Sequence, residues 1–140
     1  MRKSALYIIG VIIALLPLSG CLHNNGDIGP WFGQWKVESI EKNGEVAADY
    51  QGDGFLRFQS EVITAVRSYP SVHSSGTDYG NFVDNGSTMD VEFKEGKSIR
   101  NYLHLEEKFT FNVLKRDGSD KLLEYTDSKG DTYTYHLKKW

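Results

Sequence analysis

Histidines are the side chains of this 140-residue chain best suited to metal binding or to proton transfer near neutral pH. None has the His-x-His or His-x-x-x-His spacing with which one strand or helix builds a metal site. His104 and His136 fall in separate expected strands and would meet only across a sheet, so exposed strand positions are the simpler explanation. The chain therefore predicts no metal site and no cofactor. The four histidines are His23, His73, His104 and His136.

Carboxylates are the other candidates for catalysis. Glu106 and Glu107 are adjacent, and in an extended segment their side chains point to opposite faces, which is poor geometry for shared acid–base work. The acidic segments 117–120 and 127–131 have turn composition and lack the ligand spacing of an EF-hand. No nucleophile elbow, P-loop or dinucleotide fingerprint is present. We expect no catalytic residue. An enzyme remains a third hypothesis, which requires a cleft that joins His104 or His136 to carboxylates.

Cys21 is the single cysteine and follows an apolar leader. Arg2 and Lys3 precede a run of about 14 mostly apolar residues from Ala5 to Leu18, which is signal-peptide architecture. A membrane-spanning helix needs about 20 apolar residues, and no charged stop-transfer cluster follows. We therefore interpret residues 1–20 as a signal peptide.

The segment Leu18-Ser19-Gly20-Cys21 resembles the lipobox of bacterial lipoproteins. The resemblance implies that the thiol of Cys21 receives a diacylglyceryl group and that cleavage makes Cys21 the lipidated N-terminus. Residues 21–30 then form a flexible tether, because they are mostly polar or glycine. Leu22 in place of Asp resembles lipoproteins sent to an outer membrane. We expect a lipid-anchored envelope protein whose domain faces the periplasm.

The charge and cysteine content limit the function further. Without the leader the chain has 14 basic and 19 acidic residues, a net charge of −5, which argues against a nucleic-acid partner. Lipid on Cys21 leaves no thiol for a disulfide, so the domain must be stable through packing alone.

Turn pairs at regular intervals divide the rest of the chain, and Asn43-Gly44 is the clearest of them. Apolar and polar residues alternate between these turns, as they do in strands with one buried face. We predict an all-β antiparallel meander of about eight strands that closes into a small barrel. The expected strands lie near 33–41, 46–58, 61–68, 78–84, 88–94, 98–105, 108–116 and 121–127, with 131–139 as the last if the second is a loop.

Gly33-Gln34-Trp35 at the start of the first strand resembles the Gly-x-Trp opening of lipocalins. The pattern of residues 31–140 is similar to short lipocalin-like domains that follow lipoboxes in Bacteroides-type bacteria. The resemblance implies that Gly33 and Trp35 close one end of the barrel. It also implies a basic side chain over the tryptophan, for which Lys138 and Lys139 are the candidates.

The expected ligand site lies in the Ser/Gly-rich segment 68–77 and just after it, because adaptable polar loops with aromatic anchors often bind ligands. Tyr69, His73 and Tyr79 are its candidate residues. We expect a small-ligand-binding module, with an apolar or sugar ligand in a shallow cup, or otherwise a filled core. The alternative is an interaction lipoprotein, an inhibitor or accessory subunit that binds an envelope protein through this loop or a sheet edge.

Overall fold

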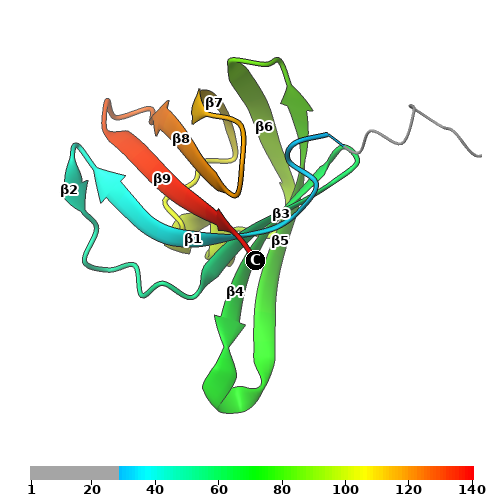
Figure 1. Ribbon diagram of the computed structural model, residues 1–140. Helices are drawn as coiled ribbons and strands as arrows, with labels where there is room; N and C mark the ends of the chain where they lie inside the picture. The colour runs from blue at the N-terminus through cyan, green and yellow to red at the C-terminus, as the bar shows by residue number, and fades with distance from the viewer. Residues whose placement is uncertain (1–28) are drawn as a thin grey trace, which may run out of the picture.

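The computed structural model describes residues 29–140 of the chain (Figure 1). The predicted signal peptide, the lipidation site Cys21 and most of the predicted tether lie outside the described residues. Within residues 29–140, no helix has the length and apolar composition needed to cross a membrane.

Eight antiparallel strands close into a barrel, as the sequence predicted. Each strand from β3 onward pairs with the next, and β1 pairs with both β3 and β9, which closes the sheet. The short strand β2 pairs only with the end of β1. The strands are β1 (Gly33–Lys42), β2 (Glu45–Val46), β3 (Gly54–Gln59), β4 (Val62–Tyr69), β5 (Ser74–Asp84), β6 (Thr88–Glu95), β7 (Lys108–Lys115), β8 (Asp120–Thr126) and β9 (Thr132–Lys139).

The turn between β1 and β2 has the backbone that its sequence demands. Asn43 and Gly44 both have positive φ, 52° and 84°, as a type I′ turn requires. In the β5–β6 turn only Gly86 is in this region, with φ of 90°. Positive φ at the glycine is thus enough to reverse the chain there.

Two expected strand segments differ from the structure, while the last strand is β9, as predicted for the case in which the second segment is a loop. Residues 47–53 of the expected strand 46–58 form a loop. The Tyr50 hydroxyl holds this loop, because it donates to the Val37 carbonyl and accepts from the Gly54 amide in place of backbone pairing between strands. The expected strand 98–105 begins with the helix α2 (Ser98–Tyr102). Ile99 and Leu103 are both buried one helical turn apart, so this segment follows the helical period and not strand alternation.

Segment 68–77, predicted to be irregular, is mostly regular structure. β4 and β5 continue past their neighbours and are joined by the short helix η3 (Pro70–Val72). The β3 ladder ends at Arg67 and the β6 ladder begins at Tyr79, so residues 68–75 form a two-stranded ribbon without a neighbouring strand on either side. This ribbon projects from the barrel at the bottom of Figure 1.

Side chains fill the interior of the barrel. Trp31 and Trp35 pack at the end where residue 29 enters, and Ile99 and Leu103 pack at the end near the ribbon. The largest fully buried side chains are Tyr125, Tyr135, Phe58, Phe111, Ile40, Leu56, Ile63, Met89, Leu103, Leu123, Leu137 and Val37. A small barrel needs side chains of this size to fill its middle.

Candidate functional site

Trp35 lies at the barrel end where the described chain begins. It is 2% exposed, and its indole N–H donates to the Trp31 carbonyl at 2.7 Å. The Lys139 ammonium lies 4.7 Å from the centre of the Trp35 ring and donates to the Phe32 carbonyl at 2.5 Å. Gly33 has φ of 111°, a backbone conformation that is strained for any residue with a side chain, and a Cβ there would also displace the end of the Lys139 side chain. Of the two candidate lysines, Lys139 covers the tryptophan.

A second lysine at this end was not predicted. Lys121 is only 3% exposed, and its ammonium lies 4.8 and 4.6 Å from the centres of the Trp31 and Trp35 rings. It donates to the Arg116 carbonyl, and burial lowers the pKa of its amine. Since Lys121 alternates with the buried Leu123 and Tyr125, the inward strand pattern was the available signal.

The three expected ligand residues do not form one site. Tyr69 is the last residue of β4, and its ring centre lies 5.3 Å from the guanidinium carbon of Arg67. His73 ends η3 at the tip of the ribbon in the left-handed conformation, with φ of 48°. Tyr79 lies five residues beyond Ser74 on β5, roughly 17 Å away at about 3.3 Å per residue. Its side chain is 45% exposed, and its hydroxyl accepts from the Thr77 hydroxyl at 3.2 Å.

The two strand-region histidines each pair with a different carboxylate. His104 Nε2 lies 2.9 Å from Asp49, and its ring stacks on Tyr133. His136 Nε2 lies 2.8 Å from Glu41 across the β1–β9 ladder. Residues 29–140 contain no cluster of three or more His, Cys, Asp or Glu side chains placed to hold a metal ion.

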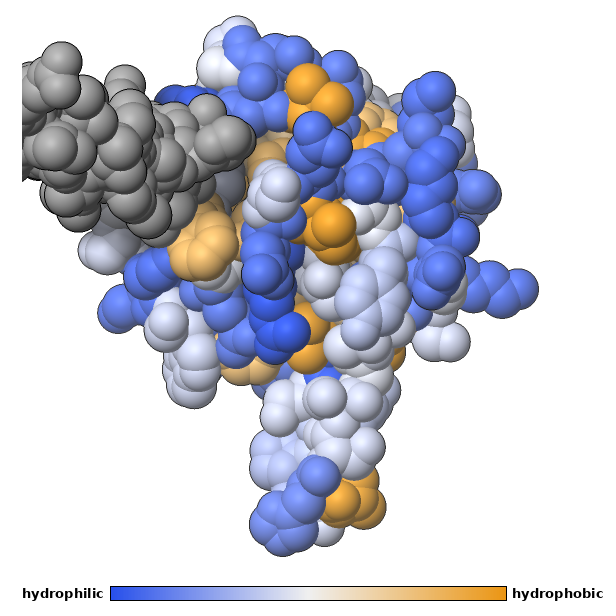
Figure 2. All heavy atoms as spheres, turned by 90° about the vertical axis from the view of Figure 1, so that its right-hand side faces the viewer, coloured by the Kyte–Doolittle hydropathy of each residue, from blue (hydrophilic) through white to orange (hydrophobic). Residues whose placement is uncertain are grey.

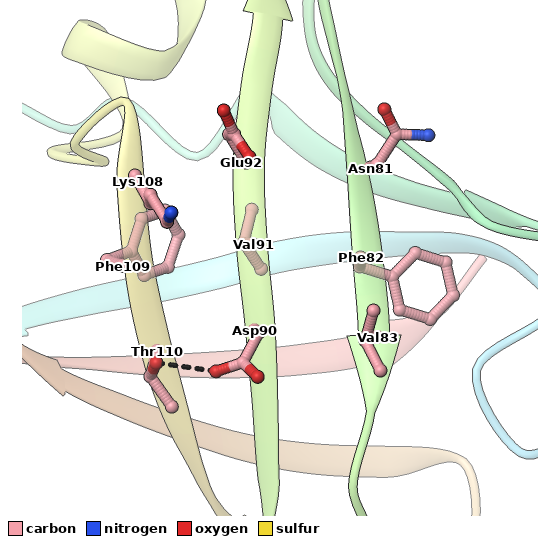
Figure 3. A pocket seen from close by; sticks show the side chains of 9 residues that line it. All are labelled: Asn81, Phe82, Val83, Asp90, Val91, Glu92, Lys108, Phe109 and Thr110. Carbon is pink, nitrogen blue, oxygen red and sulfur yellow. Dashed lines mark hydrogen bonds between the residues drawn. The ribbon is translucent and has the colours of Figure 1, made fainter.

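A groove of about 270 Å³ crosses the outer face of β5, β6 and β7 (Figure 3). The strand register explains its shape. Phe82, Val91 and Phe109 are cross-strand partners, and side chains of this row belong to the barrel interior or pack against it. The residues before and after each of them point to the opposite face, as strand alternation requires. The two outward rows form the rims, and the inner row lies beneath the floor.

The rims contain both hydrogen-bond donors and acceptors. One rim is the cross-strand row Asn81, Glu92 and Lys108, and the other is Val83, Asp90 and Thr110. Asp90 accepts from the Thr110 hydroxyl at 2.7 Å and from the Asn85 amide at 3.0 Å.

Both groove carboxylates are held in the ionised form. The hydrogen bonds from Thr110 and then Asn85 lower the pKa of Asp90. The Lys94 ammonium, 2.7 Å from Glu92, lowers the pKa of that carboxyl. At neutral pH two ionised carboxylates therefore line the groove beside the amide of Asn81 and the ammonium of Lys108, and each oxygen of Asp90 already accepts one hydrogen bond from the protein.

Exposed apolar side chains extend this face of the barrel. Val62 and Tyr79 line a neighbouring hollow, and Val83 is 59% exposed at the groove rim. Figure 2 shows hydrophobic side chains scattered among polar ones on this side of the molecule, and another hydrophobic group at the end of the ribbon. Val72 of the ribbon is 66% exposed.

An arginine cluster at the base of the ribbon was also missed by the sequence analysis. We use this name for Asp53, Arg67, Tyr69 and Tyr102. Arg67 Nε donates to Asp53 Oδ2 at 3.0 Å, and the guanidinium carbon lies 3.7 Å from the centre of the Tyr102 ring and 5.3 Å from that of Tyr69. The Tyr102 hydroxyl donates to Asp53 Oδ1 at 2.5 Å.

Two solved structures share the fold. A lipocalin-like protein from Bacteroides uniformis is 19% identical, with a TM-score of 0.63 over 80% of this chain and 100% of that chain. An uncharacterized protein from Bacteroides eggerthii is 17% identical, with a TM-score of 0.63 over 79% of this chain and 99% of that chain. Comparisons with known protein families and with curated proteins find no match. The barrel is therefore lipocalin-like and resembles domains of Bacteroides, as residues 33–35 predicted.

Proposed function

We propose that this protein is a lipid-anchored binding module without catalytic activity that holds a sugar on the outside of its barrel. The observation that carries the proposal is the filled interior. Tyr125, Tyr135 and Phe111 occupy the middle of the barrel, and tryptophans and α2 cover its ends. A ligand must then bind an outer surface, and the groove over β5–β7 is the hollow with matched polar rims.

A hydroxylated ligand fits the groove better than an apolar one. Sugar hydroxyls both donate and accept, and the rims present the Asp90 and Glu92 carboxylates, the Asn81 amide and the Lys108 ammonium. Charged acceptors make stronger hydrogen bonds than neutral ones. A volume of about 270 Å³ is near the lower end of ligand pockets, so one or two sugar units are the expected length.

The anchor part of the proposal depends on the lipobox resemblance of residues 18–21. A multiply acylated Cys21 binds a membrane persistently, because a second chain converts marginal attachment into stable anchoring. The binding module then acts at a membrane surface of the envelope.

The test is an NMR titration of the full chain, in detergent, with a panel of mono- and disaccharides. We expect saturable shifts at residues 81–83, 90–92 and 108–110, and at least tenfold weaker binding in Asn81→Leu. Asn112→Leu makes the same change at an exposed position of β7 outside the groove and is expected to bind as the parent does. Equal weakening by both variants, or no saturable shift with any sugar, refutes the groove as a sugar site.

The ribbon favours a second candidate, an interaction protein. Residues 68–75 have no strand on either side and carry the exposed Val72, so a partner segment can add to a free edge. Replacing residues 70–73 by Asn-Gly removes the tip and leaves the groove intact. If this variant loses a crosslinked envelope partner and still binds sugar, the ribbon and the groove have separate functions. If the parent binds sugar and no crosslinked partner depends on the tip, the sugar-binding function is favoured.

A further inference from the structure

We propose that Arg67 is the recognition residue of a second site, at the base of the ribbon, that binds an oxyanion group, a carboxylate or phosphate, of a ligand. Arg67 lies on β4 directly before the ribbon begins. The site is separate from the sugar groove and does not depend on it.

The first argument is that the guanidinium is held in place on three sides. Asp53 accepts from its Nε at 3.0 Å, the Tyr102 ring lies 3.7 Å beneath it, and the Tyr69 ring lies 5.3 Å away. Tyr69 in turn packs near the backbone of Gly76 on the opposite strand. An arginine fixed in this way loses little rotamer freedom when a ligand binds.

The second argument is that the outer fork of Arg67 is unused. Within residues 29–140, neither of its terminal amino groups has a hydrogen-bond partner, whereas both of those in Arg116 bind Asp84 at 2.6 Å. Arg57 also uses a terminal amino group, which donates to Gln34 at 2.7 Å. The two free groups of Arg67 form the fork that matches both oxygens of a carboxylate or phosphate.

The third argument is that Asp53 is already satisfied. Its Oδ2 accepts from Arg67 Nε and its Oδ1 accepts from the Tyr102 hydroxyl at 2.5 Å, so it does not need the free fork. These hydrogen bonds, although opposed by burial, lower the pKa of Asp53 and keep its charge as a fixed orienting group. The Tyr69 hydroxyl has no hydrogen-bond partner within residues 29–140, and the centre of its ring lies 5.3 Å from the guanidinium carbon.

The fourth argument is access. The Arg67 side chain is 23% exposed, so part of it is open to solvent in the folded protein. It also lies at the ribbon end of the barrel. β4 begins at Val62, beside the turn near the chain entry, and Arg67 lies five residues further on, roughly 17 Å away at about 3.3 Å per residue.

The experiment follows the Nε–Hε signals of the arginines by NMR in the full chain, in detergent at constant chloride. The probes are N-acetylglycine, which carries a carboxylate, inorganic phosphate, and N-acetylglycinamide as the neutral match. We expect a saturable shift of the Arg67 signal and of amides 67–76 with at least one anion and none with the amide. Saturation by one anion alone identifies which oxyanion the site selects.

The variants decide whether the shift is specific. Arg67→Lys keeps the charge and loses the fork, and is expected to weaken binding at least tenfold, whereas Arg57→Lys makes the same change on the outer face and leaves it unchanged. A non-saturating shift, or equal weakening by Arg67→Lys and Arg57→Lys, overturns the proposal. The titration of the unmodified chain tests the proposal without any variant, so a mutant that fails to fold does not leave the proposal untested.

Discussion

The Asp84–Arg116 ion pair joins the β5–β6 turn to the end of β7. Both terminal amino groups of Arg116 donate to the Asp84 carboxylate at 2.6 Å, and the Gly86 amide donates to it at 2.9 Å. Arg116 is the largest cause that lowers the pKa of Asp84. A bidentate, partly buried pair of this kind is worth more than an ordinary surface ion pair.

Asp84→Asn is expected to lower the free energy of unfolding at pH 7 by about 1–2 kcal/mol. The folded pKa of Asp84 lies below the unfolded value, so its contribution is complete above the unfolded pKa and is lost as the pH falls through the folded pKa. Urea unfolding at pH 7 and near pH 2 measures the difference, which should shrink in acid. Glu45→Gln, at an exposed carboxyl on β2, is the control. An equal loss at both pH values contradicts the role of the ionised pair.

Site residues were harder to predict from the sequence than strands. Trp35 was identifiable because it belongs to a short sequence motif. Arg67 is a candidate only because Asp53 and Tyr102 hold its guanidinium, and these residues lie 14 and 35 positions away in the chain. Tyr69 was chosen as a loop aromatic and lies in fact beside that arginine. No local pattern encodes such contacts, because they depend on which strands become neighbours.

Helix α2 is held at its beginning by one buried carboxylate. Asp78 is 4% exposed, and its Oδ2 accepts from the backbone amides of Ile99 and Arg100, each at 2.8 Å. Gly96 passes so close that a Cβ there would lie 2.0 Å from Asp78 Oδ1. A helix of five residues is too short to be stable alone, so this contact and the burial of Ile99 define it.

Asp78→Ala is expected to destabilise the protein by about 1–2 kcal/mol, because two buried amide donors lose their acceptor. Hydrogen exchange should accelerate first at residues 99–103. Asp78→Asn retains an acceptor oxygen and is expected to lose less than half as much. If the two variants exchange equally fast at these amides, the carboxylate oxygen is not what holds α2.

The missed helix shows the limit of prediction at the scale of elements. Alternation and glycine turns located β5, β6 and β9 within a few residues, because one buried face imposes a period of two. Segment 98–105 has apolar residues that fit a strand nearly as well as a helix. Its conformation is decided by Asp78, 20 residues upstream of Ser98, and so by tertiary contact.

The barrel contains buried tyrosines whose hydroxyls ionise less readily than those of exposed tyrosines. Burial raises the pKa of Tyr50, Tyr125 and Tyr135, and the Tyr135 hydroxyl donates to the Leu103 carbonyl at 2.7 Å. Folded pKa values above the unfolded value of about 10 mean that the neutral hydroxyls stabilise the fold below pH 10. This stability is lost as the pH rises toward the folded values.

A jump from pH 8 to pH 12 should therefore produce two phases of phenolate absorbance. Exposed tyrosines ionise within the mixing time, and the buried class ionises with the rate of unfolding followed by tryptophan fluorescence. Tyr135→Phe should reduce the slow amplitude by one tyrosine and leave the fast amplitude unchanged. A single fast phase contradicts a barrel interior closed to solvent.

The proposed anchor would connect to one end of the barrel. Residue 29 enters beside Gln59, Ser60 and Asp84, at the end opposite the ribbon, so a tether from Cys21 attaches the barrel by the tryptophan end. The ribbon and Arg67 lie toward the other end of the barrel from this point of attachment.

Cys21→Ser is expected to move the protein from the membrane to the soluble fraction, because no thiol remains to carry the diacylglyceryl group. Fractionation after a high-salt and alkaline wash measures this, and intact mass shows whether the acyl chains are present. Ser19→Ala keeps a small residue at that position and is expected to remain acylated and membrane-bound. Membrane retention of Cys21→Ser at the parent level, or a parent mass without acyl chains, contradicts lipid anchoring.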